Sequence, residues 1–490
     1  MSLTKVTNSM ISGAVLSILD FGAIPNDDTK SAVNKTAMQD AIAYAVANGV
    51  FEINVPGVFY MTGDISIVNW GITISGQSSA YRYYNIGKTT GSNIIFTSGT
   101  VGFNLNTAPP TYPNSDYFCL RDLTLDGNSV VLFGVISSGA KVFQNVTIQY
   151  FLTAGLRLDD LTNSTLVNQS SLLNNGKGLE VLGQGTTVFS VTDTNIRNNT
   201  IGVYLEGGKG VRFQNCVIES NTSYGLHVNV PAGQSVGNVT FERVWFENNN
   251  YVGNTAQVRL EGVDASADLY MLSFAHCLFD TLTNTSKQDL YMAAGSWTRF
   301  DRCQFTNLVS TGIELTTKVS YAQFFNCERG ANPISPKTYI NDNGYATTFN
   351  NNNVFFVGPN LVGAAVWTNV SYGGFTSTGN KVTVANSASG AVSATMPGQA
   401  RSKGQAYVIQ VAYVQNSGQA ATFRITNGDN TVDLVNSILV PGLNTIYFTE
   451  TVTDSGSLIT VSNTAATSWA MSENLIAYET ARGYIQYNNG

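Results

Sequence analysis

The sequence predicts an all-β protein whose main part is a parallel β-helix, a solenoid of stacked coils. A short capping helix is expected before it and a β-sandwich-like domain after it. Charged residues make up only 12% of the chain, while aromatic residues (11%) and glycines (46) are frequent, as in all-β proteins with many turns. A short phrase recurs with a period of about 24 residues as far as residue 330. Alternating apolar and polar segments without that period follow it.

The N-terminal segment predicts a lead-in over residues 1–18 and then a capping helix. Residues 34–48 have helical spacing, with Asn34 as the expected N-cap and Gly49 as the stop signal. The small and apolar residues of this segment share one face: Ala37, Met38, Ala41, Ile42 and Ala45. Because the end of a β-helix is an exposed strand edge that can pair with other chains, we expect the helix to cover it.

The recurring phrase predicts the coils themselves. It is an apolar residue, any residue, a turn-type polar residue, a small residue, any residue and an aliphatic residue or Phe, as in Leu120–Leu125, Phe213–Ile218 and Phe274–Phe279. This period fits one coil of three short strands, which buries its inner face only when neighbouring coils stack on it. We expect the capping helix and the β-helix to span residues 19–345.

Two positions of the phrase have predicted structural roles. The third is usually Asn or Asp, whose side chains tolerate a left-handed backbone: Asp122, Asn145, Asp193, Asn215 and Asn326. His276 falls at the same position and is expected to serve the turn. The fourth position holds Cys216, Cys277, Cys303 and Cys327, which we interpret as buried, inward-pointing thiols rather than as a metal or redox cluster.

Beyond residue 345 the period fades. Residues 346–375 are predicted to be a junction, and residues 376–490 a C-terminal β domain for trimerisation or carbohydrate binding. The last residues, 472–490, are expected to begin with a short helix.

Composition excludes several classes of function. The net charge is −7 and no Lys/Arg cluster exists, so we expect no nucleic-acid partner. No apolar run approaches the roughly 20 residues that span a bilayer, so no membrane insertion is expected. The chain has only two histidines, His227 and His276, and no CxxC pair. We therefore expect no metal site and no cofactor.

Outward positions of successive coils form stripes, and one stripe is acidic. The first outward residue after the phrase is Glu219, Glu247 and Asp280 in three consecutive coils. Equivalent positions in adjacent strands lie about 4.8 Å apart. Glycoside hydrolases need two carboxyls about 5–5.5 Å or about 6.5–9.5 Å apart, depending on stereochemistry. Like charges at such distances separate the pKa values as an acid/base pair requires. These three are therefore the candidate catalytic residues.

The next strand supplies candidate substrate-binding residues, which suit sugar stacking and acidic sugar groups. They are Glu180, Tyr204, Glu206, His227, Arg259, Glu261 and Tyr291, with Trp245 beside the carboxylates. The coils concerned are long, and extra loops at Val230–Val236 and Asn248–Asp268 are expected to wall a groove. The alternative is that any of these polar residues is merely solvated surface.

The N-terminal opening resembles a known family. It reads Asp20-Phe21-Gly22-Ala23, then the acidic turn at Asp27, the helix, and a strand that ends in Val55-Pro56-Gly57. This order resembles the pectate-lyase-like right-handed β-helix family, although Asp28 stands where that family usually has Gly. Within the family the chain is most similar to bacteriophage tailspike depolymerases, because of its lead-in and its extra C-terminal β region.

The resemblance implies a right-handed β-helix and a homotrimer attached to a virion tail or baseplate protein. It also implies binding and cleavage of bacterial surface polysaccharide, capsule or O-antigen. The leading hypothesis is endo-glycosidic hydrolysis with Glu247 and Asp280 as the acid/base pair. Two alternatives stay open. One is a polysaccharide lyase that acts by β-elimination on a uronate polymer, and the other is a receptor-binding spike without enzymatic activity.

Overall fold

The computed structural model describes residues 15–67, 71–78, 91–105, 117–139, 141–159, 164–249, 256–280, 288–306 and 312–329, and strands of the C-terminal part between 340 and 480. The chain forms two compact units. The coil unit comprises Met1–Asn307 and Gln323–Gly330, and the C-terminal unit comprises Leu308–Ala322 and Ala331–Gly490. Most of the predicted junction lies outside the described residues, so the predicted boundaries at 345 and 375 stay predictions.

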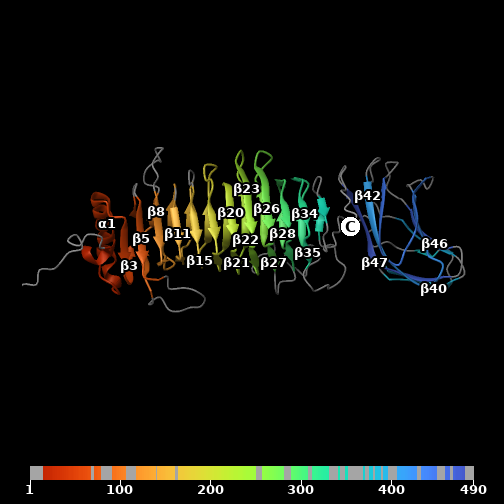
Figure 1. The fold of residues 1–490 in the computed structure, drawn as a ribbon, viewed down its shortest axis with the longest axis horizontal. Coiled ribbons are helices and arrows are strands. Elements are labelled where there is room, and N and C mark those ends of the chain that lie inside the picture. The colour runs from red at the N-terminus through yellow and green to blue at the C-terminus, as the bar shows by residue number, and fades with distance from the viewer. Residues whose placement is uncertain are drawn as a thin grey trace, which may run out of the picture. The chain divides into compact units, whose positions relative to one another are not determined.

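The coil unit is a parallel β-helix, as predicted (Figure 1). Its strands form three parallel sheets, and each complete coil adds one strand to every sheet. Sheet A contains β1 Leu16–Ser17, β2 Glu52–Val55, β5 Ile72–Gly76, β8 Phe118–Arg121, β11 Lys141–Gln144, β14 Leu166–Asn168, β17 Ser190–Thr192, β20 Lys209–Gln214, β23 Ser235–Glu242, β26 Asp268–Ala275, β29 Gly295–Ser296, β30 Arg299–Asp301 and β34 Gln323–Phe325.

Sheet B contains β3 Val58–Thr62, β6 Asn93–Ser98, β9 Thr124–Asp126, β12 Thr147–Gln149, β15 Ser171–Leu173, β18 Asn195–Arg197, β21 Val217–Glu219, β24 Trp245–Glu247, β27 Leu278–Asp280, β31 Gln304–Phe305 and β35 Glu328–Arg329. Sheet C contains β4 Ile65–Ser66, β7 Val101–Asn104, β10 Phe133–Ser137, β13 Ala154–Leu158, β16 Lys177–Val181, β19 Ile201–Leu205, β22 Tyr224–Val230, β25 Val258–Gly262 and β28 Leu290–Met292.

The predicted helix is α1, Ser31–Asn48, and Gly49 ends it in the left-handed conformation (φ 65°). Every residue of its predicted apolar face is buried. The N-cap prediction was wrong, because the helix starts earlier, after the 3-10 turns η2 Ile18–Phe21 and η3 Asp28–Lys30. Asn34 is instead buried inside the first turns of the helix. There its side chain accepts a hydrogen bond from the Ile24 amide and donates to the carbonyls of Ile24 and Tyr60.

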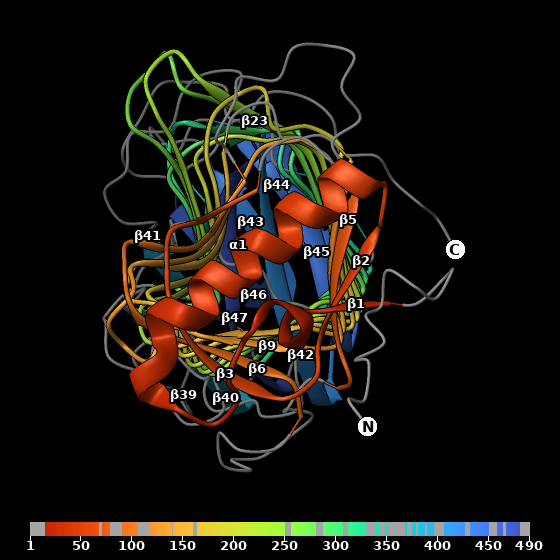
Figure 2. The same ribbon diagram turned by 90° about the vertical axis from the view of Figure 1, so that its left-hand side faces the viewer.

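Helix α1 covers the N-terminal end of the coil stack. Figure 2 shows it lying across the first strands, with β2 and β3 directly behind it. The predicted cap is therefore present, and the strand edge at this end is not left open for pairing with another chain.

The core of the stack is built from ladders of identical rings. Along sheet A, the rings of Phe213, Phe241, Phe274, Phe300 and Phe324 stack with centroids 4.6–4.8 Å apart. This spacing is the distance between adjacent strands, so the period of the sequence becomes a continuous aromatic column. The four repeat cysteines are buried free thiols beside this column, as predicted.

Two turns connect the sheets within each coil. Between sheets A and B, the third residue of the phrase adopts positive φ, for example 58° at Asp122 and 53° at Asn215, which confirms the prediction for that position. Between sheets B and C lies a buried ladder that the sequence analysis missed: Asn175, Asn199, Asn221 and Asn249. The Nδ2 of each of the first three donates to the Oδ1 of the next Asn at 2.7–3.1 Å, so buried polar groups of the turn are satisfied along the axis.

The C-terminal unit contains two five-stranded antiparallel sheets, which fits the predicted β-sandwich-like domain. One comprises β38 Thr368–Asn369, β41 Gly390–Thr395, β46 Leu458–Asn463, β43 Thr422–Thr426 and β44 Asp433–Ile438, and the other β39 Phe375–Thr378, β40 Lys381–Ser387, β47 Thr467–Thr480, β42 Ala406–Gly418 and β45 Gly442–Thr449. The unit also contains β32 Ile313–Leu315, β33 Val319–Ser320, β36 Ile340–Asp342 and β37 Thr348–Asn350. The helix expected from residue 472 was wrong. That segment belongs to β47, whose pairing with β42 and β40 overrides the local helical pattern.

Candidate functional site

The three candidate catalytic carboxylates lie in register on sheet B. Glu219 pairs with Glu247 across β21 and β24, and Glu247 pairs with Asp280 across β24 and β27. All three are half-buried and lie on the outer face, because the residues before them, such as Phe246 and Phe279, point into the core. We call Glu219, Glu247 and Asp280 the carboxylate row.

The members of the carboxylate row differ in their partners. Glu219 forms an ion pair with Arg197 at 3.0 Å, and Asp280 accepts a hydrogen bond from the Thr306 hydroxyl at 2.7 Å. Glu247 lies between the other two carboxylates, and its side chain has no hydrogen bond or ion pair within the described part of the chain. Burial, followed by the charges of Glu219 and Asp280, raises the pKa of Glu247 above its usual value. The row thus places a carboxyl with a raised pKa between two neighbours that have stabilising partners.

Trp245 lies two residues before Glu247 on β24, so both side chains point to the same face. The indole is 44% exposed, and its strand neighbours Val217 and Leu278 extend an apolar strip beside the carboxylates. An exposed ring at this place offers a flat surface for a sugar ring, as the sequence analysis expected.

The remaining predicted site residues gather on sheet C. Glu180, Tyr204, His227, Arg259 and Tyr291 follow one another in strand register from β16 to β28. Glu206 and Glu261 lie two residues further along their coils. We call these seven residues the sheet C cluster. It lies beyond the asparagine ladder from the carboxylate row, so the structure brings the predicted residues together in two groups rather than in one.

Charges in the sheet C cluster are compensated. Glu261 accepts from Arg259 Nε at 2.8 Å through one oxygen and lies 2.7 Å from His227 Nε2 through the other. Burial acts to raise the pKa of Glu261, but the bonds from His227 and Arg259 outweigh it and hold the pKa below its usual value. Burial lowers the pKa of His227, against the opposing effect of Glu261. The imidazole is therefore neutral at neutral pH.

Tyr204 is fixed by its neighbours. Its hydroxyl donates to Glu206 at 2.5 Å and accepts from Asn229 at 3.2 Å. Burial and the hydrogen bond to Glu206 raise the pKa of Tyr204 to about 12. Lys177 lies over the ring, with Nζ 4.1 Å from its centroid. Such a phenol stays protonated and positions its neighbours rather than acting as a base.

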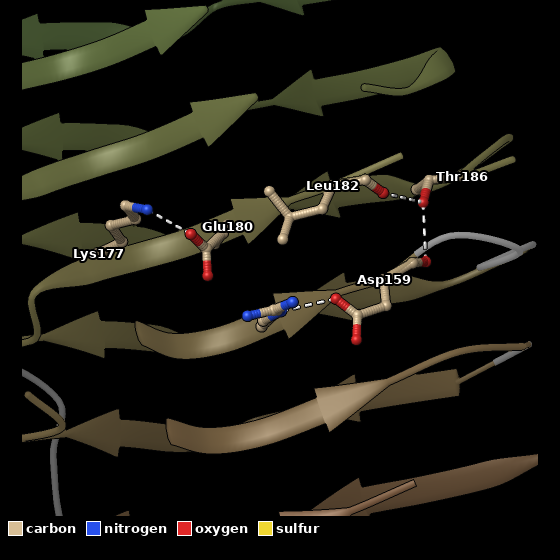
Figure 3. A network of polar contacts seen from close by, with 6 residues as sticks. Asp159, Lys177, Glu180, Leu182 and Thr186 are labelled. Carbon is tan, nitrogen blue, oxygen red and sulfur yellow. Dashed lines mark hydrogen bonds and ion pairs between the residues drawn. The ribbon is translucent and has the colours of Figure 1, made fainter. Parts of the chain in front are cut away.

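Glu180 is the most buried carboxylate of the cluster. It forms an ion pair with Lys177, and its side chain is only 6% exposed (Figure 3). On the preceding coil Asp159 pairs with Arg157 at 2.6 Å. The sequence analysis missed Lys177 and Asn229 as partners, although Lys177 precedes Glu180 by three residues on the same strand.

The predicted groove-walling loops were wrong in large part. Val258–Gly262 is strand β25, and only 231–234 separate β22 from β23. Residues 250–255 lie outside the described part. The extra residues instead lengthen β22, β23 and β26, so the turns before β23 and β26 rise above the neighbouring coils (Figure 1).

Within the described residues, no group of three or more His, Cys, Asp and Glu side chains could hold a metal ion. A search of the same residues for helices long and apolar enough to cross a membrane found none.

Three parallel sheets, an asparagine ladder and outward polar rows define a parallel β-helix protein with a candidate carbohydrate site. Residues 133–262 match the family model described as right handed beta helix region, so the handedness and the predicted resemblance in fold are confirmed. No curated protein matches the chain.

Solved structures with a similar fold have low sequence identity to this chain. The A-module of the mannuronan C-5 epimerase AlgE6 from Azotobacter vinelandii is 12% identical, with a TM-score of 0.45 over 69% of this chain and 98% of that one. ORF18 of Geobacillus virus E2 is 15% identical, with a TM-score of 0.45 over 97% and 79%. The enzymatically active domain of tailspike protein 4 from bacteriophage CBA120 is 11% identical, with a TM-score of 0.44 over 95% and 68%.

Proposed function

We propose that this protein cleaves a bacterial surface polysaccharide by endo-glycosidic hydrolysis at the carboxylate row. The observation that carries the proposal is the placing of Glu247 between two other carboxylates, with its pKa raised and no compensating partner in the described residues. A carboxyl with a raised pKa next to a second carboxyl is the arrangement that glycosidic cleavage requires. The bacterial-surface part of the proposal rests on the resemblance to tailspike depolymerases, which comes from the lead-in and the extra C-terminal β region.

Glu247 is the proposed acid and Asp280 the proposed nucleophile. Residues paired on adjacent strands lie about 5 Å apart, which is the carboxyl separation of retaining enzymes. Glu247 protonates the glycosidic oxygen as the C–O bond breaks, and Asp280 attacks the anomeric carbon to form a glycosyl ester. Glu247 then takes a proton from water, which hydrolyses the ester and releases Asp280.

The neighbours have supporting roles in this scheme. Thr306 orients the Asp280 carboxylate by a hydrogen bond to Oδ1. Arg197 holds the Glu219 carboxylate in place through their ion pair. That negative charge maintains the raised pKa of Glu247. Trp245 stacks on a sugar ring next to the scissile linkage, and the sheet C cluster contacts more distant parts of the polymer.

Incubation with a panel of capsular and O-antigen polysaccharides, followed by mass spectrometry, tests the proposal. We expect oligosaccharides that each carry one added water, and nuclear magnetic resonance should show retention at the anomeric carbon. Glu247→Gln is the matched control, because it keeps the size of the side chain and cannot donate the proton. Binding without release of oligosaccharide would instead identify a receptor-binding spike without enzymatic activity.

A polysaccharide lyase is the second candidate, and one observation favours it. His227 is neutral, its Nε2 is bound to Glu261, and its buried Nδ1 has no hydrogen-bond partner in the structure. In this second candidate function Nδ1 would accept the C5 proton of a uronate, which requires the substrate to displace the groups that cover it, and Arg259 lies beside the imidazole. Lyase products absorb ultraviolet light through a new double bond and carry no added water, so the same incubation distinguishes the two reactions.

We also propose a homotrimer that is part of a virion tail. The support is the family resemblance and the second β unit. In addition, few charges lie on the outer surfaces of the coils, so the desolvation free energy lost when these surfaces pack together is small. Light scattering should give three times the chain mass of 52.5 kDa, and a monomer in solution would contradict this.

A further inference from the structure

The turn between sheets A and B carries a column of basic side chains in three consecutive coils. Arg243, His276 and Arg302 each occupy the third position of the phrase, with φ of 53°, 54° and 52°. Their amides continue the axial ladder, because Arg243 N donates to the Ala275 carbonyl and His276 N to the Asp301 carbonyl. We call Arg243, His276 and Arg302 the turn column.

The turn column departs from the residue types that this backbone favours. Left-handed backbone disfavours ordinary side chains, whereas Asn, Asp and to some extent His adopt it more readily. The other described coils have Asp122, Asn145, Asp193, Asn215 and Asn326 there, with uncharged Gln169 as an exception. Two arginines at such positions lower stability relative to Asn. Positions where a local rule is broken in this way are frequently functional sites.

The arginines of the turn column form no ion pair of their own in the part of the chain that the structure describes. The acidic groups next to them on sheet A are paired elsewhere, since Glu242 pairs with Arg212 at 2.7 Å and Asp301 with Arg299 at 3.2 Å. Arg243, His276 and Arg302 are exposed, and within the described residues none of the three forms an ion pair. The hydrogen bond from Arg212 is the main cause that lowers the pKa of Glu242, and Arg243 and His276 lie close enough to lower it further. The column therefore presents the positive charge of its two arginines to solvent.

The turn column belongs to the same coils as the proposed acid and nucleophile. Along one coil, Arg243, Trp245 and Glu247 alternate at outward positions. On the next coil the equivalent residues are His276, Leu278 and Asp280, and β27 pairs with β24 in this register. A polymer lying across these coils meets a basic column, an apolar strip and the carboxylate row in that order.

We propose that the turn column binds an anionic substituent, carboxylate or phosphate, on a sugar near the scissile linkage, so that the substrate is an acidic polysaccharide. This inference rests on the proposed function. A guanidinium presents planar, paired donors that match either anion. The chain has a net charge of −7, and its carboxylate row also repels an acidic polymer. A local positive column is therefore what allows such a substrate to reach these coils.

Binding measured without turnover tests this inference. The Glu247→Gln variant is applied to immobilised capsular polysaccharides, some neutral and some bearing uronic acids or phosphodiesters. We expect it to retain acidic polymers selectively. Adding Arg243→Gln and Arg302→Gln should weaken that binding at least tenfold and flatten its dependence on salt. The matched control is Arg299→Gln, in the same coil as Arg302 but paired with Asp301, and it should leave binding unchanged.

The outcomes separate this inference from the proposed function. Selective binding of neutral polymers, or equal losses in Arg299→Gln and the double variant, would overturn the inference while hydrolysis by the unmodified chain still stood. Failure of the unmodified chain to cleave any polymer would overturn the proposed function even if acidic polymers were retained. Reducing the carboxyl groups of the polymer to alcohols distinguishes the two anions, because it abolishes recognition of a uronate and preserves recognition of a phosphate.

Discussion

The carboxylate row and the sheet C cluster run along the same coils, but they differ in how their carboxylates are paired with positive groups. In the sheet C cluster Glu261 is bound by both His227 and Arg259, and Glu180 by Lys177. In the carboxylate row Glu247 faces two further carboxylates. Both rows occupy outward positions on strands of the same stack, so the backbone is not the source of the difference.

This difference suits the sheet C cluster to substrate binding and the carboxylate row to catalysis. A network of satisfied ion pairs is rigid and resists changes in protonation, which suits recognition of a fixed ligand. An uncompensated carboxyl among like charges changes its protonation easily, which suits proton transfer. We therefore expect substitutions in the carboxylate row to lower the rate of turnover, and substitutions in the sheet C cluster to alter substrate binding or stability.

The largest expected effect is on turnover. Glu247→Gln and Asp280→Asn should each reduce kcat by about 10²–10⁴-fold, because each removes one partner of a proton transfer or of a covalent step. Glu206→Gln, on the sheet C cluster, should change kcat by no more than about tenfold, since it weakens a single hydrogen bond with Tyr204. Rates are measured as release of oligosaccharide from the polymer identified in the screen.

The opposite result would contradict this assignment of roles to the two groups of residues. If Glu206→Gln and Glu180→Gln abolished cleavage while the carboxylate-row variants kept near-normal rates, the chemistry would belong to sheet C. That result would favour the lyase reaction with His227 as the base.

The next effect is on stability and concerns the buried pair of sheet C. Lys177→Met removes the ion-pair partner of the nearly buried Glu180, and it should lower the free energy of unfolding by about 3 kcal/mol. Urea unfolding of the full chain measures this loss. Adding Glu180→Gln should restore most of it, because no unpaired buried charge then remains. An unchanged unfolding midpoint in Lys177→Met would show that the pair is solvated in solution.

Much of the fold followed from the sequence because its signals are periodic. The spacing of the phrase from Phe213 to Phe324 predicted both the coils and the ring column that fills them. The asparagine ladder was missed, because Asn175, Asn199, Asn221 and Asn249 fall in a polar turn where Asn is common and where nothing in the sequence shows burial. The β47 strand was missed since its local pattern is helical, and pairing with β42 decides its conformation.

The strand register of the candidate site residues could be predicted from the sequence, but their ion-pair and hydrogen-bond partners could not. Stripes of outward residues placed Glu247 beside Asp280 correctly, because equivalent positions in coils align. Which carboxylates are paired could not be predicted, since Arg197 and Lys177 reach Glu219 and Glu180 through side-chain conformations that a sequence pattern does not specify.

A smaller effect concerns the pH dependence of cleavage. The proposed acid Glu247 must be protonated, so kcat/KM falls as pH rises through its raised pKa. Glu219→Gln removes a negative neighbour and frees Arg197, and both changes lower the pKa of Glu247. The alkaline limb should therefore move to lower pH. Arg197→Gln is the matched control with the opposite sign, because it leaves Glu219 unpaired. Shifts in the same direction for both variants would contradict the assigned role.

The smallest expected effect is a gain in stability from removing the Glu247 charge. Burial and like charges raise the native pKa of Glu247 above its unfolded value. The native state therefore binds the proton more tightly, and stability rises as pH falls through the native pKa. Above the native pKa the carboxyl is ionised in both states and the whole penalty is present. Glu247→Gln should then raise the free energy of unfolding by less than about 1 kcal/mol, the range for like-charged neighbours on adjacent strands. The gain should vanish at acidic pH, where Glu247 is protonated in both states.

Glu261→Gln, whose parent carboxylate has a lowered pKa, should instead destabilise at pH 7, and chemical unfolding at both pH values compares the two variants. A loss of stability in both variants would mean that Glu247 has a stabilising partner in solution, and the distinction between the two rows would fail.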